Sequence, residues 1–152
     1  MTADFRNYLN ADSFVRITGK TRSGIFTELI EHAVRRRDVE AEDVFSAIMA
    51  REKMMSTAVG GGLAIPHGRL KNFGEPLILV GVCPDGVTDY AGLDGVPVKL
   101  ALLVLVDYCD AELHLSLLRS IAHELLASPE KITAIAGLRD PAHMMALLTD
   151  KM

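Results

Sequence analysis

His67 stands in a segment that would hold its imidazole stiffly and leave one side of the ring open. The apolar run before it ends in Ile65-Pro66, Gly68 follows, and three glycines occupy positions 60–62. Pro66 fixes its own φ and pushes Ile65 toward an extended conformation, while Gly68 permits close approach of a ligand or another backbone. We expect His67 at a stiff strand end. Spacing alone leaves two interpretations open, a functional imidazole or a turn histidine that only binds a backbone carbonyl.

Two further residues could act with it. His114 falls in the first turn or so of a helix that Asp110 can cap, at the edge of an apolar stripe. It is either a satisfied boundary residue or part of an anion site, because helix starts carry unpaired N–H groups and partial positive charge. Arg51 extends the apolar face of an earlier helix by one turn. It either reaches out to water or faces His67, where its fork of donors would suit a phosphoryl group.

These three residues fit one reaction, the transfer of a phosphoryl group. A neutral imidazole nitrogen can attack phosphorus and hold the group as a labile phosphoramidate. The product would carry close to two negative charges, which a second histidine and an arginine could stabilise. No cofactor is required, and we expect none. The other histidines, at positions 32, 123 and 143, are expected on solvated helix faces.

Other kinds of site have weaker support. Zinc held by His67, His114 and Cys109 is conceivable, and with it a metal-dependent enzyme, but HExxH and CxxC spacings are absent. The glycine run lacks the GxxxxGK pattern of a phosphate-binding loop.

The composition bears on partners and location. The 152 residues are 49% hydrophobic and carry a net charge of -4, which argues against a nucleic-acid face. The apolar run Leu100–Val106 is far shorter than the roughly 20 residues of a membrane helix. No signal peptide is visible, and Cys83 and Cys109 suit a reducing compartment. We expect a soluble cytoplasmic protein with no membrane insertion.

The apolar pattern predicts one α/β domain over residues 1–152, a mixed sheet flanked by helices. Turns are expected at Pro84–Gly86 and Asp94–Gly95. The expected strands are 14–17, 77–82 and 98–106. One helix should begin after Thr21 and bury 25, 26, 29, 30 and 33, and a second should use Val44, Phe45, Ile48 and Met49. A third should begin after Asp110 and bury Ala111, Leu115, Leu118, Ala122 and Leu125. Two more should start at Pro129 and Pro141, after the capping residues Ser128 and Asp140.

Residues 52–68 resemble the signature of type-2 EIIA domains of the bacterial phosphoenolpyruvate-dependent phosphotransferase system. The likeness extends from about Ser13 to Leu148 and includes the pairs Arg51-Glu52, Ser56-Thr57 and His114-Leu115. The signature slots are filled by Glu52, Val59, Gly60, Leu63, Ala64, Ile65, Pro66, His67 and Gly68.

The resemblance implies a role for each candidate residue. By it, His67 is the phosphoryl acceptor, His114 contacts the phosphoryl group and Arg51 lies nearby. It also implies the EIIA type-2 fold, an HPr-type phosphocarrier protein as donor, and the cysteine of an EIIB domain as acceptor. Where this chain has Ala58 and Gly61, relatives often have Gly and Asn, respectively. The second difference leads us to expect a more mobile active-site loop.

Two versions of this function remain open, a sugar-transport subunit and a nitrogen-type regulator that signals through its phosphorylation state. The stand-alone length and the run Arg51–Met54 favour the regulator. A different class of hypothesis is an interaction module that keeps the fold without phosphotransfer, although the presence of all three site residues argues against it.

Overall fold

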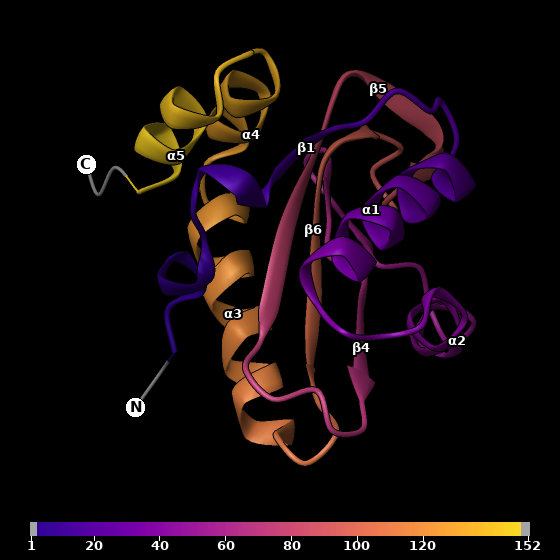
Figure 1. Ribbon diagram of the computed structural model, residues 1–152. Helices are drawn as coiled ribbons and strands as arrows, with labels where there is room; N and C mark the ends of the chain where they lie inside the picture. Colours follow the sequence, from indigo (N-terminus) through magenta and orange to yellow (C-terminus); the bar gives the residue numbers. More distant parts are fainter. Residues whose placement is uncertain (1–2, 150–152) are drawn as a thin grey trace.

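The computed structural model describes residues 3–149 and is built around a six-stranded mixed sheet (Figure 1). The strand order is β1-β5-β6-β3-β2, and β4 also pairs with β6. Strands β5 and β6 form a long antiparallel pair, whereas β1 runs parallel to β5, and β3 and β4 run parallel to β6. The strands are β1 Phe14–Arg16, β2 Ala58–Gly60, β3 Leu63–Ala64, β4 His67–Leu70, β5 Leu77–Ala91 and β6 Pro97–Asp107.

Helices cover both faces of the sheet, as the sequence predicted. Helices α1 (Arg22–Arg36) and α2 (Ala41–Glu52) lie on one face. Helices α3 (Ala111–Leu126), α4 (Pro129–Ala136) and α5 (Pro141–Thr149) lie on the other, with two short 3-10 helices, η1 (Phe5–Tyr8) and η2 (Ala11–Ser13). Within residues 3–149, none of the helices combines the length and apolar character needed to cross a bilayer.

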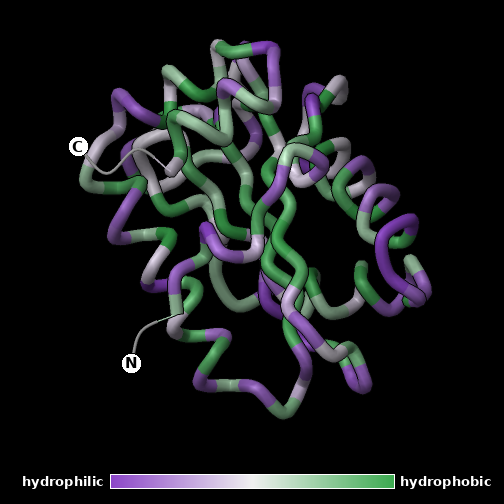
Figure 2. Tube along the Cα trace, turned by 60° about the vertical axis from the view of Figure 1, so that its left-hand side comes forward, coloured by the Kyte–Doolittle hydropathy of each residue, from purple (hydrophilic) through white to green (hydrophobic). Residues whose placement is uncertain are grey.

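The sheet divides the interior into two apolar cores. Leu77 and Leu79 of β5 pack toward α1 and α2, whereas Ile78 and Val80 pack toward α3 and α4. This alternation follows from the two-residue period of a strand. Figure 2 shows the consequence: the strands in the middle of the molecule are mostly hydrophobic, whereas hydrophobic and hydrophilic residues alternate along the surrounding helices. A sheet covered on both faces accounts for the continuous apolar runs in β5 and β6.

The helices begin where the sequence predicted, but not every predicted capping residue makes a side-chain capping bond. Thr21 Oγ1 accepts a hydrogen bond from Gly24 N at 3.0 Å, and Asp140 Oδ1 accepts one from Ala142 N at 3.0 Å. Asp110 and Ser128 occupy the N-cap positions of α3 and α4 without a side-chain capping bond.

The expected turn at Pro84–Gly86 is wrong, because β5 continues through it. The pairing register shifts between Val82 and Val87, and Gly86 adopts φ 78°. Glycine and proline there mark an irregularity within a strand. The turn at Asp94–Gly95 is confirmed, with Gly95 N donating to Gly92 O at 3.0 Å.

The predicted core face of α3 is confirmed at Leu125 but is otherwise wrong by about two positions. The fully buried side chains are Leu117, Ile121 and Leu125, while Leu115 is 53% exposed. Of the other predicted residues, Ala111 is exposed, and Leu118 and Ala122 are half-buried. The helix carries apolar residues around much of its circumference, so the sequence contained two plausible stripes. Phe45 of α2, which the sequence also placed on an apolar face, is 49% exposed.

The sequence predicted that His67 ends an extended run. In the structure it instead begins a strand, as the first residue of β4. Strands β3 and β4 follow one line along β6, and Ile65-Pro66 interrupts them. Pro66 lacks an N–H group but its carbonyl accepts from Val104 N at 3.0 Å, so the pairing with β6 continues through the break.

Gly68 lets α2 pack directly on β4, and we expect Gly68→Ala to destabilise the protein. A Cβ at Gly68 would lie 2.8 Å from Ala47 Cβ and 3.1 Å from the Ala47 carbonyl carbon. Such overpacking costs about 1–3 kcal/mol, measurable as a drop in the free energy of unfolding by denaturant titration. Gly137→Ala is the matched control, because its Cβ would make contacts of 3.6 Å or longer at φ -81°. Equal stability of both variants would contradict the prediction.

Candidate functional site

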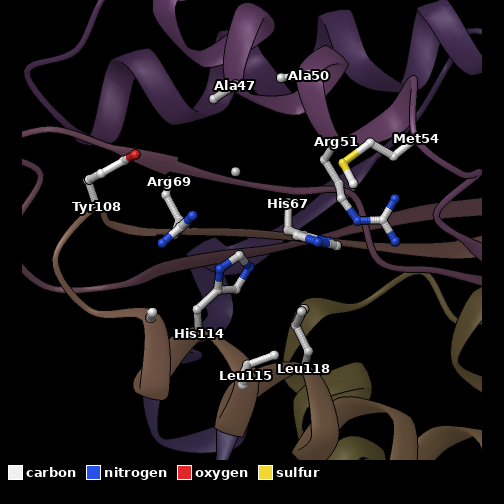
Figure 3. Close-up of a pocket in the computed structure, with 12 residues that line it drawn as sticks. Ala47, Ala50, Arg51, Met54, His67, Arg69, Tyr108, His114, Leu115 and Leu118 are labelled. Carbon is white, nitrogen blue, oxygen red and sulfur yellow. The ribbon is translucent and has the colours of Figure 1, made fainter.

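A cavity of about 660 Å³ lies between α2, β4 and α3, and it brings His67, His114 and Arg51 together (Figure 3). The side of α2 contributes Ala47, Ala50 and Arg51, and α3 contributes Ala111, His114, Leu115 and Leu118 from the opposite side. The remaining lining residues are Met54, His67, Gly68, Arg69 and Tyr108.

The ring of His67 is held in one tautomer. Its side chain is largely buried, and Nδ1 lies 2.7 Å from the carbonyl oxygen of Ile65. Because a carbonyl only accepts, Nδ1 carries the proton and Nε2 carries the lone pair. Nε2 has no hydrogen-bond partner among the described residues. The bond to a backbone carbonyl, which one of the two interpretations predicted, is therefore present, and it leaves the other nitrogen without a partner; a functional role for the ring stays a prediction.

Burial lowers the pKa of His67 below its ordinary value of 6.5, and the Arg51 cation lowers it further. The hydrogen bond with Ile65 and the charge of Glu52 oppose this shift. The imidazole is consequently neutral near pH 7, which is the form that acts as a nucleophile.

His114 faces His67 from the first turn of α3. The two ring centroids lie 4.9 Å apart with the ring planes at 74°, an edge-to-face arrangement (Figure 3). Nε2 of His114 is buried and has no hydrogen-bond partner in the described chain. Buried polar atoms are usually satisfied, so this nitrogen is free to bind a group that enters the cavity.

Two arginines lie on either side of the histidine rings in Figure 3. Arg51, in the last turn of α2, uses Nη1 to donate to Met55 O at 2.7 Å and keeps other N–H groups for a ligand. Arg69 lies on β4 with its guanidinium 4.8 Å from the centre of the Tyr108 ring. The lining residues include these two cations and no carboxylate, so the cavity favours an anion.

Sequence reasoning missed Arg69, although a signal existed. In a strand, residues two apart share a face, so a strand that presents His67 to a cavity also presents Arg69 to it.

The other candidates lie outside the cavity. His123 and His143 are exposed as predicted, and His143 Nδ1 lies 3.3 Å from Asp140 Oδ2. His32, predicted on the surface, is half-buried on α1. Cys109 is exposed and does not line the cavity. Within the described range 3–149, no group of three or more His, Cys, Asp or Glu side chains could hold a metal ion.

We expect His114 to make folding stability depend on pH in acid. Burial, followed by the charges of His67, Arg69 and Arg51, lowers its pKa from 6.5 to about 4. Between these values the unfolded chain binds more protons than the folded one, so the free energy of unfolding should fall as the pH drops through this range. Above it the group is neutral in both states and contributes no slope.

Denaturant titrations of wild type and His114→Gln, near neutral pH and at about pH 5, would check this prediction. The variant should lose less stability on acidification than the wild type does. An equal loss in both proteins would show that His114 does not carry the effect.

Comparisons with known proteins bear on the family and the fold of the chain. The family model described as "Phosphoenolpyruvate-dependent sugar phosphotransferase system, EIIA 2" matches residues 7–151. A nitrogen regulatory protein of Pseudomonas aeruginosa is 36% identical over 111 residues, which cover 72% of this chain and 71% of that protein. The crystal structure of nitrogen regulatory protein IIA-Ntr from Neisseria meningitidis is similar with a TM-score of 0.84 and 25% identity, over 95% of this chain and 98% of that one.

A further structure shares the fold at lower identity. It is a complex of enzyme IIA and phosphorylated enzyme IIB for mannitol from Escherichia coli, similar with a TM-score of 0.73 and 21% identity, over 92% of this chain and 96% of that one.

Proposed function

Because this chain belongs to the EIIA type-2 family of the phosphoenolpyruvate-dependent sugar phosphotransferase system, we propose that it is a phosphocarrier that accepts a phosphoryl group on Nε2 of His67. The observation that carries this proposal is the neutral, tautomerically fixed imidazole with its free nitrogen in a cationic cavity. In the transfer, the Nε2 lone pair forms a bond to phosphorus. The bond between phosphorus and the donor breaks, and its electron pair stays with the donor.

The neighbouring side chains supply charge stabilisation in this proposal. His114, with a proton on Nε2, would donate to a phosphoryl oxygen, and that bond would satisfy the buried nitrogen that lacks a partner. The free N–H groups of Arg51 and the guanidinium of Arg69 would meet the remaining negative charge. None of these three residues would form the covalent bond itself.

The partners follow from the same family. We propose an HPr-type phosphocarrier as donor, and as acceptor the cysteine of an EIIB domain or a regulatory target protein. The mannitol IIA of the E. coli complex binds a phosphorylated IIB, which supports a partner of that kind. The Pseudomonas relative carries the name nitrogen regulatory protein, which supports the regulatory version of the function.

Incubation with phosphoenolpyruvate, Enzyme I and an HPr-type carrier should add one phosphoryl group to the wild-type protein. Intact-mass spectrometry would detect the adduct, and it should be labile in acid and stable in base because it is a phosphoramidate. Omission of Enzyme I is the control. Absence of the adduct with every HPr-type donor of the source organism would refute the carrier function and leave the interaction module as the better explanation.

A further inference from the structure

Glu52 is a buried carboxylate that lies beside the phosphoryl-binding cavity without lining it. It is the last residue of α2, and its side chain is 2% exposed. Its Oε1 accepts from Thr57 N at 3.1 Å, and its Oε2 accepts from Thr57 Oγ1 at 2.6 Å. The guanidinium of Arg22 lies 3.8 Å away and contributes opposite charge. Two bonds to the same residue mean that this buried charge is organised around Thr57.

A third group fixes Thr57 from the sheet. Its Oγ1 is also hydrogen-bonded to the hydroxyl of Tyr90, a fully buried side chain on β5. The single hydroxyl proton of Thr57 points to the carboxylate, which only accepts. Tyr90 must therefore be the donor to Thr57. The bonds run in one direction, from Tyr90 through Thr57 to Glu52, and every hydroxyl proton has an acceptor.

The backbone of Thr57 connects this network to the reactive imidazole. The Thr57 carbonyl accepts from Ile65 N at 2.9 Å. The carbonyl of the same residue, Ile65, accepts from Nδ1 of His67 at 2.7 Å. These two bonds lie on opposite sides of the Ile65 Cα, and Pro66 restricts the backbone of Ile65 between them, so a fixed Thr57 also restricts where the Ile65 carbonyl points.

We propose that Thr57, clamped by Glu52 and Tyr90, is a positioning residue that holds the Ile65 carbonyl against Nδ1 of His67 and so keeps the Nε2 lone pair available. A neutral imidazole released from this carbonyl exchanges between two tautomers, and the one with a proton on Nε2 has no lone pair there. The consequence for phosphoryl transfer rests on the proposed function, whereas the effect on the tautomer does not.

Thr57→Val tests the proposal because it keeps the shape of the side chain and removes Oγ1. The ring ¹⁵N chemical shifts of His67 report its tautomer directly, in the unphosphorylated protein and without any partner. We expect the Nδ1–H form in the wild type and a mixture of both forms in the variant. Phosphorylation by the HPr-type donor should slow roughly three- to tenfold, because part of the imidazole population then lacks the Nε2 lone pair. Thr57→Ser keeps the hydroxyl and should restore both the tautomer and the rate.

Ser13→Ala is the matched control for a general loss of stability. Ser13 is fully buried in η2, and its Oγ accepts from Asn10 N at 3.0 Å, outside the lining of the cavity. This variant should melt at a lower temperature and keep the wild-type tautomer of His67.

The outcomes separate the two proposals. If Thr57→Val keeps the wild-type ¹⁵N shifts, or if Ser13→Ala changes them equally, Thr57 does not position His67. If Thr57→Val does not fold, Thr57→Ser tests the proposal in its place. This variant keeps the hydroxyl, so a mixture of both His67 tautomers in it would overturn the proposal. If the shifts change as expected but the wild-type protein accepts no phosphoryl group, the positioning holds and the carrier function fails.

Discussion

His67→Ala should accept no phosphoryl group at all. The substitution removes the only atom that we propose as nucleophile, so the expected effect is complete loss and not a slower rate. The measurement is intact-mass spectrometry after incubation with phosphoenolpyruvate, Enzyme I and the HPr-type carrier. The variant leaves the Ile65 carbonyl without its partner, and an unsatisfied buried acceptor costs about 1–3 kcal/mol. A thermal melt must accompany the assay to show that the protein is still folded.

The controls are the histidines that lie outside the cavity. His123→Ala and His143→Ala should accept the group at the wild-type rate, because both side chains are exposed and neither lines the site. Peptide mapping of the wild type should place the group on His67. Label on His114 would reverse the roles that we assign to the two rings.

His114→Ala and Arg51→Ala should each slow transfer about ten- to a hundredfold, since a charge-assisted hydrogen bond made only in the transition state is worth roughly 1.5–3 kcal/mol. His114→Ala should still accept the group at His67 but pass it on poorly. Arg51→Ala should accept it more slowly. Neither variant should move the modified position. Single-turnover labelling and release kinetics, with peptide mapping, would measure these effects.

Stability should change little in both variants. The partner of Arg51 is the backbone carbonyl of Met55, a residue that is 71% exposed. The Nε2 of His114 has no partner to lose. Arg35→Ala is the matched control for the loss of a cation, because Arg35 is exposed on α1 and contacts only Glu31 at 4.0 Å among the ion pairs of residues 3–149. Wild-type transfer rates in both site variants would show that the cavity does not stabilise charge as proposed.

The sequence predicted the sheet and the presence of helices on both faces, because the apolar runs of β5 and β6 and the helix starts at Thr21 and Pro141 are local signals. The register of α3 was not predictable in this way. Leu113, Leu115, Leu117 and Leu118 offer more than one apolar face, and only the packing against β6 selects Leu117. The path of β5 through Pro84 was hidden for a related reason, since turn residues also occur at strand irregularities.

The site, like the fold, was only partly predictable from local sequence. The segment before His67 was informative because proline and glycine restrict the backbone locally. The positions of Glu52 and Thr57 relative to Tyr90 depend on contacts across 33 residues of sequence, which no local pattern contains. The expected mobility caused by Gly61 remains a prediction, although its backbone N–H donates to Asp94 Oδ2 at 2.8 Å and ties that loop to the β5–β6 turn.

Because the interior is divided into two cores, the elements that carry the site residues are packed in two different places. Arg51 and His67 are carried by α2 and β4, which pack on each other at Gly68 and Ala47 in the first core. His114 is carried by α3, which is anchored in the second core by Leu117 and Ile121. Because changes in groups without shared contacts act nearly additively, substitutions in one core that do not touch the shared strand β6 leave the other core in place. For the proposed carrier, we therefore expect substitutions in the first core to change mainly the reception of the phosphoryl group at His67, and substitutions in the second core to change mainly its stabilisation by His114.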